Sequence, residues 1–219
     1  MSEQRIALPT AEHIVSTVRN LLAATCPKIE IAGSIRRRSP DVKDAEIVAI
    51  PTHATYRVIE EMVALGVWEK SRYSDGRNRW GEKYRGFDVS EFDARADRRT
   101  TLRVELFMSD VDSWGYQLAL RTGPADANKA LMIWMQDTPI RCIDGAVWYA
   151  EDWQREGEDW ISETKRRVLL ASESAWFALW GFDVVVEPWN RRADLYRRAR
   201  FDGAAMLLGD APARQQSLF

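Results

Sequence analysis

The chain has 219 residues, a length that suits one large domain or two small ones. It is 46% hydrophobic and 29% charged, as soluble globular proteins are, and no apolar run is long enough for a membrane span. The formal net charge of −2 argues against a protein that holds long duplex nucleic acid by charge alone.

Cysteine and histidine are scarce, which argues against disulfide bonds and against zinc sites. Cys26 and Cys142 lie far apart without metal-ligand spacing, so we expect two free thiols rather than a disulfide. With only His13 and His53, a zinc site is not expected. The N-terminal residues carry no apolar segment of the kind found in secretion signals, and together these features predict a cytoplasmic protein.

The first elements are predicted from apolar spacing and turn residues. A helix capped near Thr10 should precede a strand through Ile29 and Ile31, a Gly-Ser turn, and a second strand from Asp44 to Ile50 that Pro51 ends. The apolar positions of that helix are Ile14, Val15, Val18, Leu21 and Leu22.

A second helical stripe and a third strand follow. Val58, Ile59, Met62 and Val63 predict a helix closed by Gly66. Residues 67–100 are polar and predict a twisted hairpin with a loop. From Thr101 to Met108 the residues alternate, with Leu102, Val104 and Leu106 on one face and Arg103, Glu105 and Phe107 on the other.

The rest of the chain predicts a smaller lobe. We expect helices over residues 111–121 and 125–136, an α/β lobe over 140–192 with a strand at Asp183–Val186, and a last helix over 193–208 with a basic face. Residues 209–219 predict a flexible tail.

The most informative stretch runs from Gly33 to Glu46. Side chains two apart on a strand share a face, so Asp44 and Glu46 point the same way while Ala45 points into the core. Adjacent carboxylates repel unless a cation or a proton lies between them, and a Gly-Ser turn followed by arginines suits a polyphosphate. This combination predicts metal-assisted nucleotidyl transfer.

These motifs resemble those of the family X DNA polymerases, whose polymerase β-like palm belongs to the nucleotidyltransferase superfamily. The resemblance rests on Gly33-Ser34, on Asp44-Ala45-Glu46, and on Glu105 as the third strand carboxylate. Thr122-Gly123 follows Glu105 at the spacing that the family shows, and Asn128-Lys129 stands where the family carries an Asn-Lys pair.

The resemblance implies a fold and a domain order. It implies an α+β fold, with a polymerase β-like palm of mixed sheet and helices over residues 1–122. A thumb-like α/β lobe that contacts nucleotide and DNA would cover residues 123–208, and the flexible tail would cover 209–219. The protein is expected to be a monomer without membrane contact.

The same resemblance implies a site. Asp44, Glu46 and Glu105 would bind two Mg²⁺ ions, or Mn²⁺, and carry catalysis. The substrates would be gapped or primed DNA and dNTP, or NTP, in short-gap repair. The implied nucleotide-binding residues are Gly33, Ser34, Arg37, Thr122, Gly123 and Asn128, and the implied DNA-binding residues are Lys83, Tyr84 and Lys129.

Two departures from the family keep other functions open. The second and third acids are Glu where the family usually has Asp, and Leu120-Arg121 replaces the aromatic pair that excludes ribonucleotides. The chain could therefore be a template-independent nucleotidyltransferase acting on RNA, a small molecule or a protein. It could also be a catalytically weak accessory bound to DNA or to a sliding clamp.

The last five residues suggest a partner. Gln215-Gln-Ser-Leu-Phe219 resembles the clamp-binding peptide of bacterial replication proteins. Leu218 and Phe219 would enter an apolar pocket while Gln215 forms a hydrogen bond at its rim. A bacterial sliding clamp is therefore a predicted partner, in a bacterial or phage system.

Overall fold

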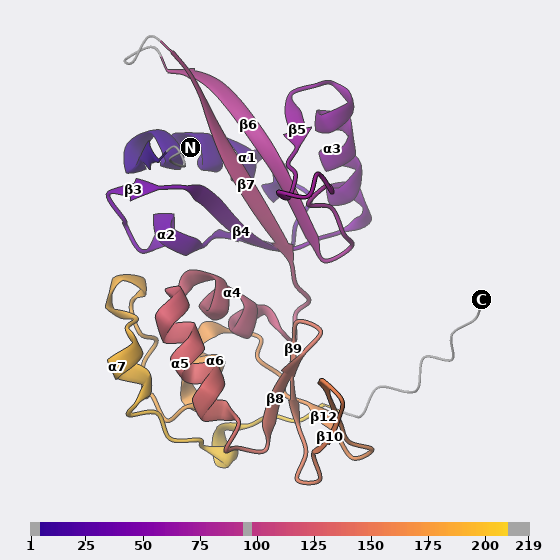
Figure 1. Ribbon diagram of the computed structural model, residues 1–219, viewed down its shortest axis with the longest axis vertical. Helices are drawn as coiled ribbons and strands as arrows, with labels where there is room; N and C mark the ends of the chain where they lie inside the picture. Colours follow the sequence, from indigo (N-terminus) through magenta and orange to yellow (C-terminus); the bar gives the residue numbers. More distant parts are fainter. Residues whose placement is uncertain (1–4, 94–97, 210–219) are drawn as a thin grey trace, which may run out of the picture. The chain divides into compact units, whose positions relative to one another are not determined.

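The computed structural model describes residues 5–93 and 98–209, and the chain divides into two compact units (Figure 1). The first unit comprises residues 1–110 and the second residues 111–219. Both mix helices and strands, so the expected α+β class with a mixed sheet is confirmed. The division follows Asp110, whereas the sequence-based boundary follows Thr122, so the helix ending at Thr122 belongs to the second unit.

A five-stranded mixed sheet forms the centre of the first unit. Its strand order is β2 (Lys28–Ile31), β4 (Asp44–Ile50), β7 (Arg98–Met108), β6 (Tyr84–Asp93) and β5 (Trp68–Lys70). Only the β4–β7 pair is parallel. The short strands β1 (Ile6–Ala7) and β3 (Asp41–Val42) pair separately.

Helices α1 (Leu8–Ala23) and α3 (His53–Ala64) bury their apolar stripes against one face of this sheet. Ile14 and Val18 of α1 and Ile59 of α3 join Ile47 and Leu106 of the sheet in one buried cluster. With α1 and α3 packed on one face, the other face of the sheet is available for polar groups.

Two details of the predicted helices need correction. Helix α1 begins at Leu8, so Thr10 lies inside it and does not cap it, because Pro9 fits the first turn, where its missing N–H leaves no bond unmade. Leu21, expected inward, is 43% exposed. Helix α3 ends as predicted before Gly66, whose φ is +69°.

The second unit packs three helices against small sheets. Helices α4 (Trp114–Thr122), α5 (Ala125–Met135) and α6 (Glu173–Leu179) share a core that includes Trp176 and Trp180. A three-stranded sheet has the order β12 (Arg166–Arg167), β9 (Ala146–Tyr149) and β8 (Ile140–Ile143), and β10 (Gln154–Glu156) pairs with β11 (Asp159–Ile161).

The end of the described chain differs from the prediction. No strand forms at Asp183–Val186, where Val184 is 73% exposed. The helix expected over residues 193–208 is one turn, α7 (Ala193–Tyr196), flanked by the 3-10 turns η1 (Pro188–Asn190) and η2 (Gly203–Ala205). Arg200 and Asp202 donate their backbone N–H groups to Trp180 and Leu179, so tertiary hydrogen bonds replace helical ones.

Across the described ranges, no helix combines the length and the apolar character that crossing a membrane requires. Cys26 and Cys142 are free thiols, as expected, and each is half-buried.

Candidate active site

Three strand carboxylates lie on the open face of the first unit's sheet. Ala45 and Ile47 are fully buried, so Asp44 and Glu46 point to the opposite face, as predicted. In the parallel β4–β7 pair, Glu46 lies opposite Glu105 and Asp44 lies opposite Arg103. Partnered residues in a sheet project to the same side, so the register puts Glu46 and Glu105 side by side.

Gly33 lies directly against the Glu46 carboxylate. The predicted Gly-Ser turn is a one-turn helix, α2 (Gly33–Arg36), which packs on β4. Gly33 has a φ of +64°, and a Cβ there would overlap the Glu46 side-chain oxygen Oε2. Only glycine suits both the backbone angle and the approach, so this residue couples the α2 segment to the acidic pair.

Arg79 and Tyr84 hold the third carboxylate. Arg79 Nη1 donates to Glu105 Oε1 at 2.9 Å, and the Tyr84 hydroxyl donates to the same oxygen at 3.0 Å. The Arg79 guanidinium also lies over the Tyr73 ring, 4.4 Å from its centroid. The Arg79 and Glu105 side chains are 23% and 15% exposed, so this ion pair is largely shielded from water.

The pKa of Tyr84 reflects this environment. Burial raises the pKa of its hydroxyl to about 12, and the nearby Glu105 charge adds to the rise while Arg79 opposes it. The hydroxyl therefore keeps its proton at neutral pH and can donate it to Glu105.

Gly86 leaves room for the segment that carries Arg79 to lie close to β6. It lies opposite Glu105 in the β6–β7 ladder. Its carbonyl accepts from the Ser71 N–H, and its own N–H donates to the Arg79 carbonyl. A Cβ at Gly86 would approach Ser71 Oγ to 2.6 Å and Arg79 Cβ to 2.8 Å. Arg79 was not identified from the sequence as a partner of Glu105, and the glycine within β6, Gly86, was the signal that could have indicated a close approach of another segment.

A second ion pair lies farther along the same face. Asp88 of β6 is opposite Arg103 of β7, and Arg103 Nε lies 3.7 Å from Asp88 Oδ1. Burial raises the pKa of Asp88, and Arg103 opposes that rise. The open face therefore alternates acids with arginines, which limits the repulsion between its carboxylates.

The predicted phosphate-binding residues lie on or just after α2. Ser34 and Arg37 are both half-buried, and Arg38 has a φ of +58°, so the chain turns sharply after them. The Ser39 N–H donates to the Ser34 carbonyl at 3.0 Å, closing this turn. The basic turn thus comes only a few residues after Gly33, which lies against Glu46.

The carboxylates suit a hard cation by their chemistry, because carboxylate oxygens are the ligands that Mg²⁺ prefers. Within the described residues, however, no three His, Cys, Asp or Glu side chains are gathered closely enough to hold a metal ion. Glu105 Oε1 instead accepts hydrogen bonds from Arg79 and Tyr84. The site therefore combines an acidic pair with a third acid that an arginine neutralises.

The predicted residues of the second unit have structural contacts of their own. Asn128 Nδ2 donates to the carbonyls of Leu120 and Gly123 at 2.7 and 3.2 Å, which joins the end of α4 to α5. A Cβ at Gly123 would press on the Asn128 side-chain oxygen, and Thr122 is fully buried. Lys129 is exposed on α5.

The remaining predicted residues fall in two places. Lys83 is exposed beside the start of β6, next to the half-buried Tyr84. Gln215, Leu218 and Phe219 of the predicted clamp-binding peptide lie outside the described residues.

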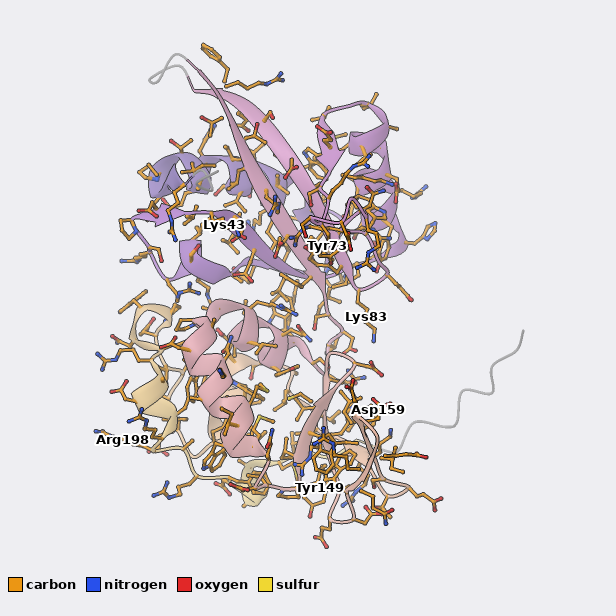
Figure 2. All side chains as sticks on the ribbon, viewed as in Figure 1. Lys43, Tyr73, Lys83, Tyr149, Asp159 and Arg198 are labelled. Atoms are coloured by element: carbon orange, nitrogen blue, oxygen red, sulfur yellow. The ribbon has the colours of Figure 1, made fainter. Side chains whose placement is uncertain are left out.

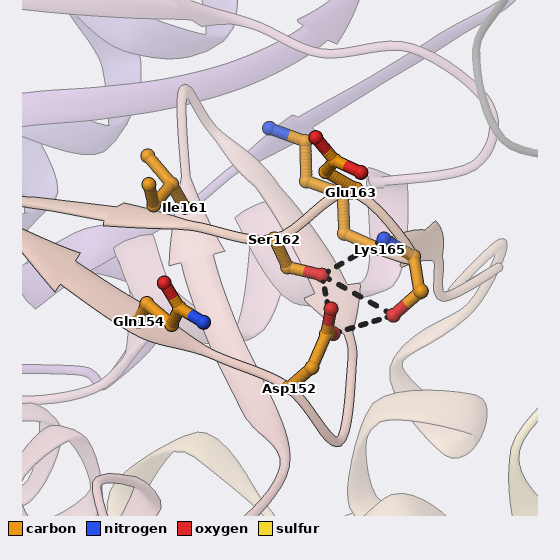
Figure 3. Close-up of a pocket in the computed structure, with 7 residues that line it drawn as sticks. Asp152, Gln154, Ile161, Ser162, Glu163 and Lys165 are labelled. Carbon is orange, nitrogen blue, oxygen red and sulfur yellow. Dashed lines mark hydrogen bonds between the residues drawn. The ribbon is translucent and has the colours of Figure 1, made fainter.

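The second unit also contains a polar pocket of about 490 Å³ beside the β10–β11 hairpin (Figure 3). Asp152 accepts hydrogen bonds from the hydroxyls of Ser162 and Thr164, and these bonds hold its pKa below the usual value. They fasten the two ends of the hairpin together, which is a structural role.

No protein-family model matches the chain, and no curated protein matches it at a significant level. What the protein does must therefore be inferred from its own residues.

Proposed function

We propose that the protein is a metal-dependent nucleotidyltransferase with a polymerase β-like palm, and specifically a small DNA polymerase that fills short gaps. The observation that carries the proposal is the β4–β7 register, with Glu46 opposite Glu105 and Asp44 on the same face. The contact between Gly33 and Glu46 adds to it, because it joins the acidic pair to the basic turn after α2.

In this mechanism Asp44, Glu46 and Glu105 would hold Mg²⁺. The metal would neutralise charge on the triphosphate and lower the pKa of a primer 3′-hydroxyl. Ser34 and Arg37 would bind the β- and γ-phosphates, and a guanidinium suits a two-point grip on phosphate oxygens. Gly33 leaves the backbone open to close approach.

Arg79 and Tyr84 would position Glu105. Their two hydrogen bonds fix one carboxylate oxygen, so the orientation of the other is set as well. Such support matters because an error of about 1 Å in a reacting group can cost roughly a hundredfold in rate. Contacts of Asn128 with nucleotide, and of Lys83 and Lys129 with DNA, remain predictions from the family resemblance.

Primer extension on a duplex with a one-nucleotide gap tests the proposal. The wild-type chain with Mg²⁺ or Mn²⁺ should add only the complementary nucleotide, and Asp44→Asn or Glu46→Gln should lower the rate by at least a hundredfold. Glu91→Gln is the matched control, because Glu91 is a β6 carboxylate on the opposite face, 3.5 Å from His13 Nε2.

One observation favours a second function. The ion pair between Arg79 and Glu105 competes with metal binding, as expected of a catalytically weak accessory that retains only the fold. Addition of nucleotides without regard to template would instead favour transfer to another acceptor. Absence of any transfer, with DNA binding retained, would favour the accessory.

A further inference from the structure

The positive charge of the second unit is concentrated in one short segment. Residues 111–219 contain 13 Lys and Arg against 16 Asp and Glu, so this unit is acidic as a whole. Residues 189–200 nevertheless contain five arginines and one aspartate. A strongly basic segment on an acidic unit creates a local positive potential, which favours an anionic partner at that place.

Burial separates one of the five arginines from the others. Arg191 is 2% exposed and forms an ion pair with Glu173, so it serves the core. Arg192, Arg197, Arg198 and Arg200 are all exposed, and we refer to these four as the arginine surface. Figure 2 shows Arg198 extending from the α7 side of the second unit.

The backbone of this segment is held in place from the inside. Tyr196 is 2% exposed and Ala199 is fully buried, and α7 packs on α5. Arg197 and Arg198 lie between these two anchors, so their stems start from a fixed position. Binding a partner there would order the side chains alone, which lowers the entropic cost.

Carboxylates compensate this surface only weakly. Arg192 Nε lies 3.5 Å from Asp194 Oδ1, but both side chains are more than 60% exposed, and such pairs contribute little. Among the described residues, no carboxylate lies within ion-pair distance of Arg197 or Arg198. In the same segment of the chain, Trp189 of η1 is 49% exposed.

We infer that the arginine surface binds the phosphate backbone of DNA. A short segment that exposes several arginines and an aromatic ring is typical of nucleic-acid contact. An anionic membrane fits less well, because α7 is a single turn and presents no apolar face that could enter a bilayer. The choice of DNA rests on the proposed function, but the surface itself lies wholly within the second unit.

Fluorescence anisotropy of the full chain with a labelled gapped duplex, measured from 50 to 200 mM salt, tests this inference. Arg197→Ala/Arg198→Ala should weaken binding by roughly tenfold and lower the salt slope by about 2, one unit for each arginine removed from a phosphate. Arg197→Lys/Arg198→Lys should restore the slope. Arg155→Ala/Arg166→Ala, which alters two exposed arginines elsewhere in the unit, should leave it unchanged.

The outcomes separate this inference from the proposed function. An unchanged slope in Arg197→Ala/Arg198→Ala, or no DNA binding by the wild type, would overturn the inference whatever the chemistry. Binding of the wild type to anionic vesicles in preference to DNA would overturn it as well. Loss of nucleotidyl transfer in Asp44→Asn with normal DNA affinity would leave the inference intact, because that variant changes only the first unit.

Discussion

An ion pair in the core of the second unit is buried far more deeply than the ion pairs on the sheet of the first unit. On the sheet of the first unit, Arg79 pairs with Glu105 and Arg103 with Asp88, and these side chains are between 15% and 31% exposed. In the second unit, Arg191 pairs with Glu173 at side-chain exposures of 0% and 9%. Partly exposed charges can exchange partners with a ligand, whereas a deeply buried pair is held together by the cost of leaving either charge buried without the other.

The largest expected effect comes from breaking the buried pair. Arg191→Met should lower the free energy of unfolding of the second unit by about 3–5 kcal/mol, because Glu173 would remain buried without its partner. Arg191 also donates from Nε to the Val186 carbonyl at 2.9 Å, so the loop before η1 would lose its anchor. Urea unfolding followed by tryptophan fluorescence reports this unit, since eight of the ten tryptophans lie in it.

Arg192→Met is the matched control for this change. Its side chain is 74% exposed, so the urea midpoint should stay where it is in the wild type. Equal midpoints for the two variants would show that Arg191 is no more important to the core than its exposed neighbour.

The second prediction concerns the coupling of Gly33 to Glu46. Gly33→Ala should cost about 1–2 kcal/mol for its positive φ, and about 1–3 kcal/mol more because the methyl group overlaps the Glu46 carboxylate. Displacement of Glu46 should also abolish most of the proposed nucleotidyl transfer. Chemical unfolding and primer extension, each compared with the wild type, measure the two effects.

Gly66→Ala is the control for Gly33→Ala, because it introduces the backbone strain of a positive φ without any overlap with another side chain. Gly66 has a φ of +69°, close to that of Gly33, but nothing lies within 4 Å of its added Cβ. This variant should show only the strain and keep full activity. If Gly33→Ala and Gly66→Ala had the same reduced stability and the same reduced activity, the contact of Gly33 with Glu46 would contribute nothing to either.

Some of these features could be predicted from the sequence and others could not, for physical reasons. Asp44 and Glu46 were placed on one face because a strand has a strict period of two, and β4 has the predicted bounds. Glu105 was grouped with them only through the family resemblance, because the period of one strand does not fix its register with another, and the β4–β7 pairing is what puts it opposite Glu46. The ion pair of Arg79 with Glu105 escaped prediction because the segment before β6 is irregular, and backbone hydrogen bonds bring Arg79 beside Gly86. The prediction of a helix over 193–208 was wrong because backbone hydrogen bonds to Leu179 and Trp180, which are remote in sequence, override the local helix propensity.

The third prediction removes the arginine that neutralises Glu105. Arg79→Met should lower the stability of the metal-free protein by about 1–3 kcal/mol, because a largely buried carboxylate loses its charged donor. It should also increase the rise in melting temperature that Mn²⁺ produces, since Glu105 no longer has an internal cation. Differential scanning fluorimetry with and without Mn²⁺ measures both effects.

Arg77→Met provides the control within the same segment. Arg77 pairs locally with Asp75 at 2.8 Å, and its side chain is 80% exposed. It should change neither the stability nor the response to Mn²⁺. A Mn²⁺ response in Arg79→Met no larger than that of the wild type would mean that Arg79 does not compete with a metal ion for Glu105.

The smallest expected effect is a pH dependence that Tyr84 introduces into the first unit. Its folded-state pKa of about 12 lies above the ordinary value of 10.0, so the folded protein holds the phenolic proton more tightly than the unfolded chain. The resulting stability is fully present below pH 10 and is lost as the pH rises through 12. Tyr84→Phe removes this contribution and the hydrogen bond to Glu105, worth about 1 kcal/mol. The difference in unfolding free energy between wild type and Tyr84→Phe should therefore shrink between pH 9 and pH 11.5. A difference that stayed constant over this range would mean that folding does not raise the pKa of Tyr84.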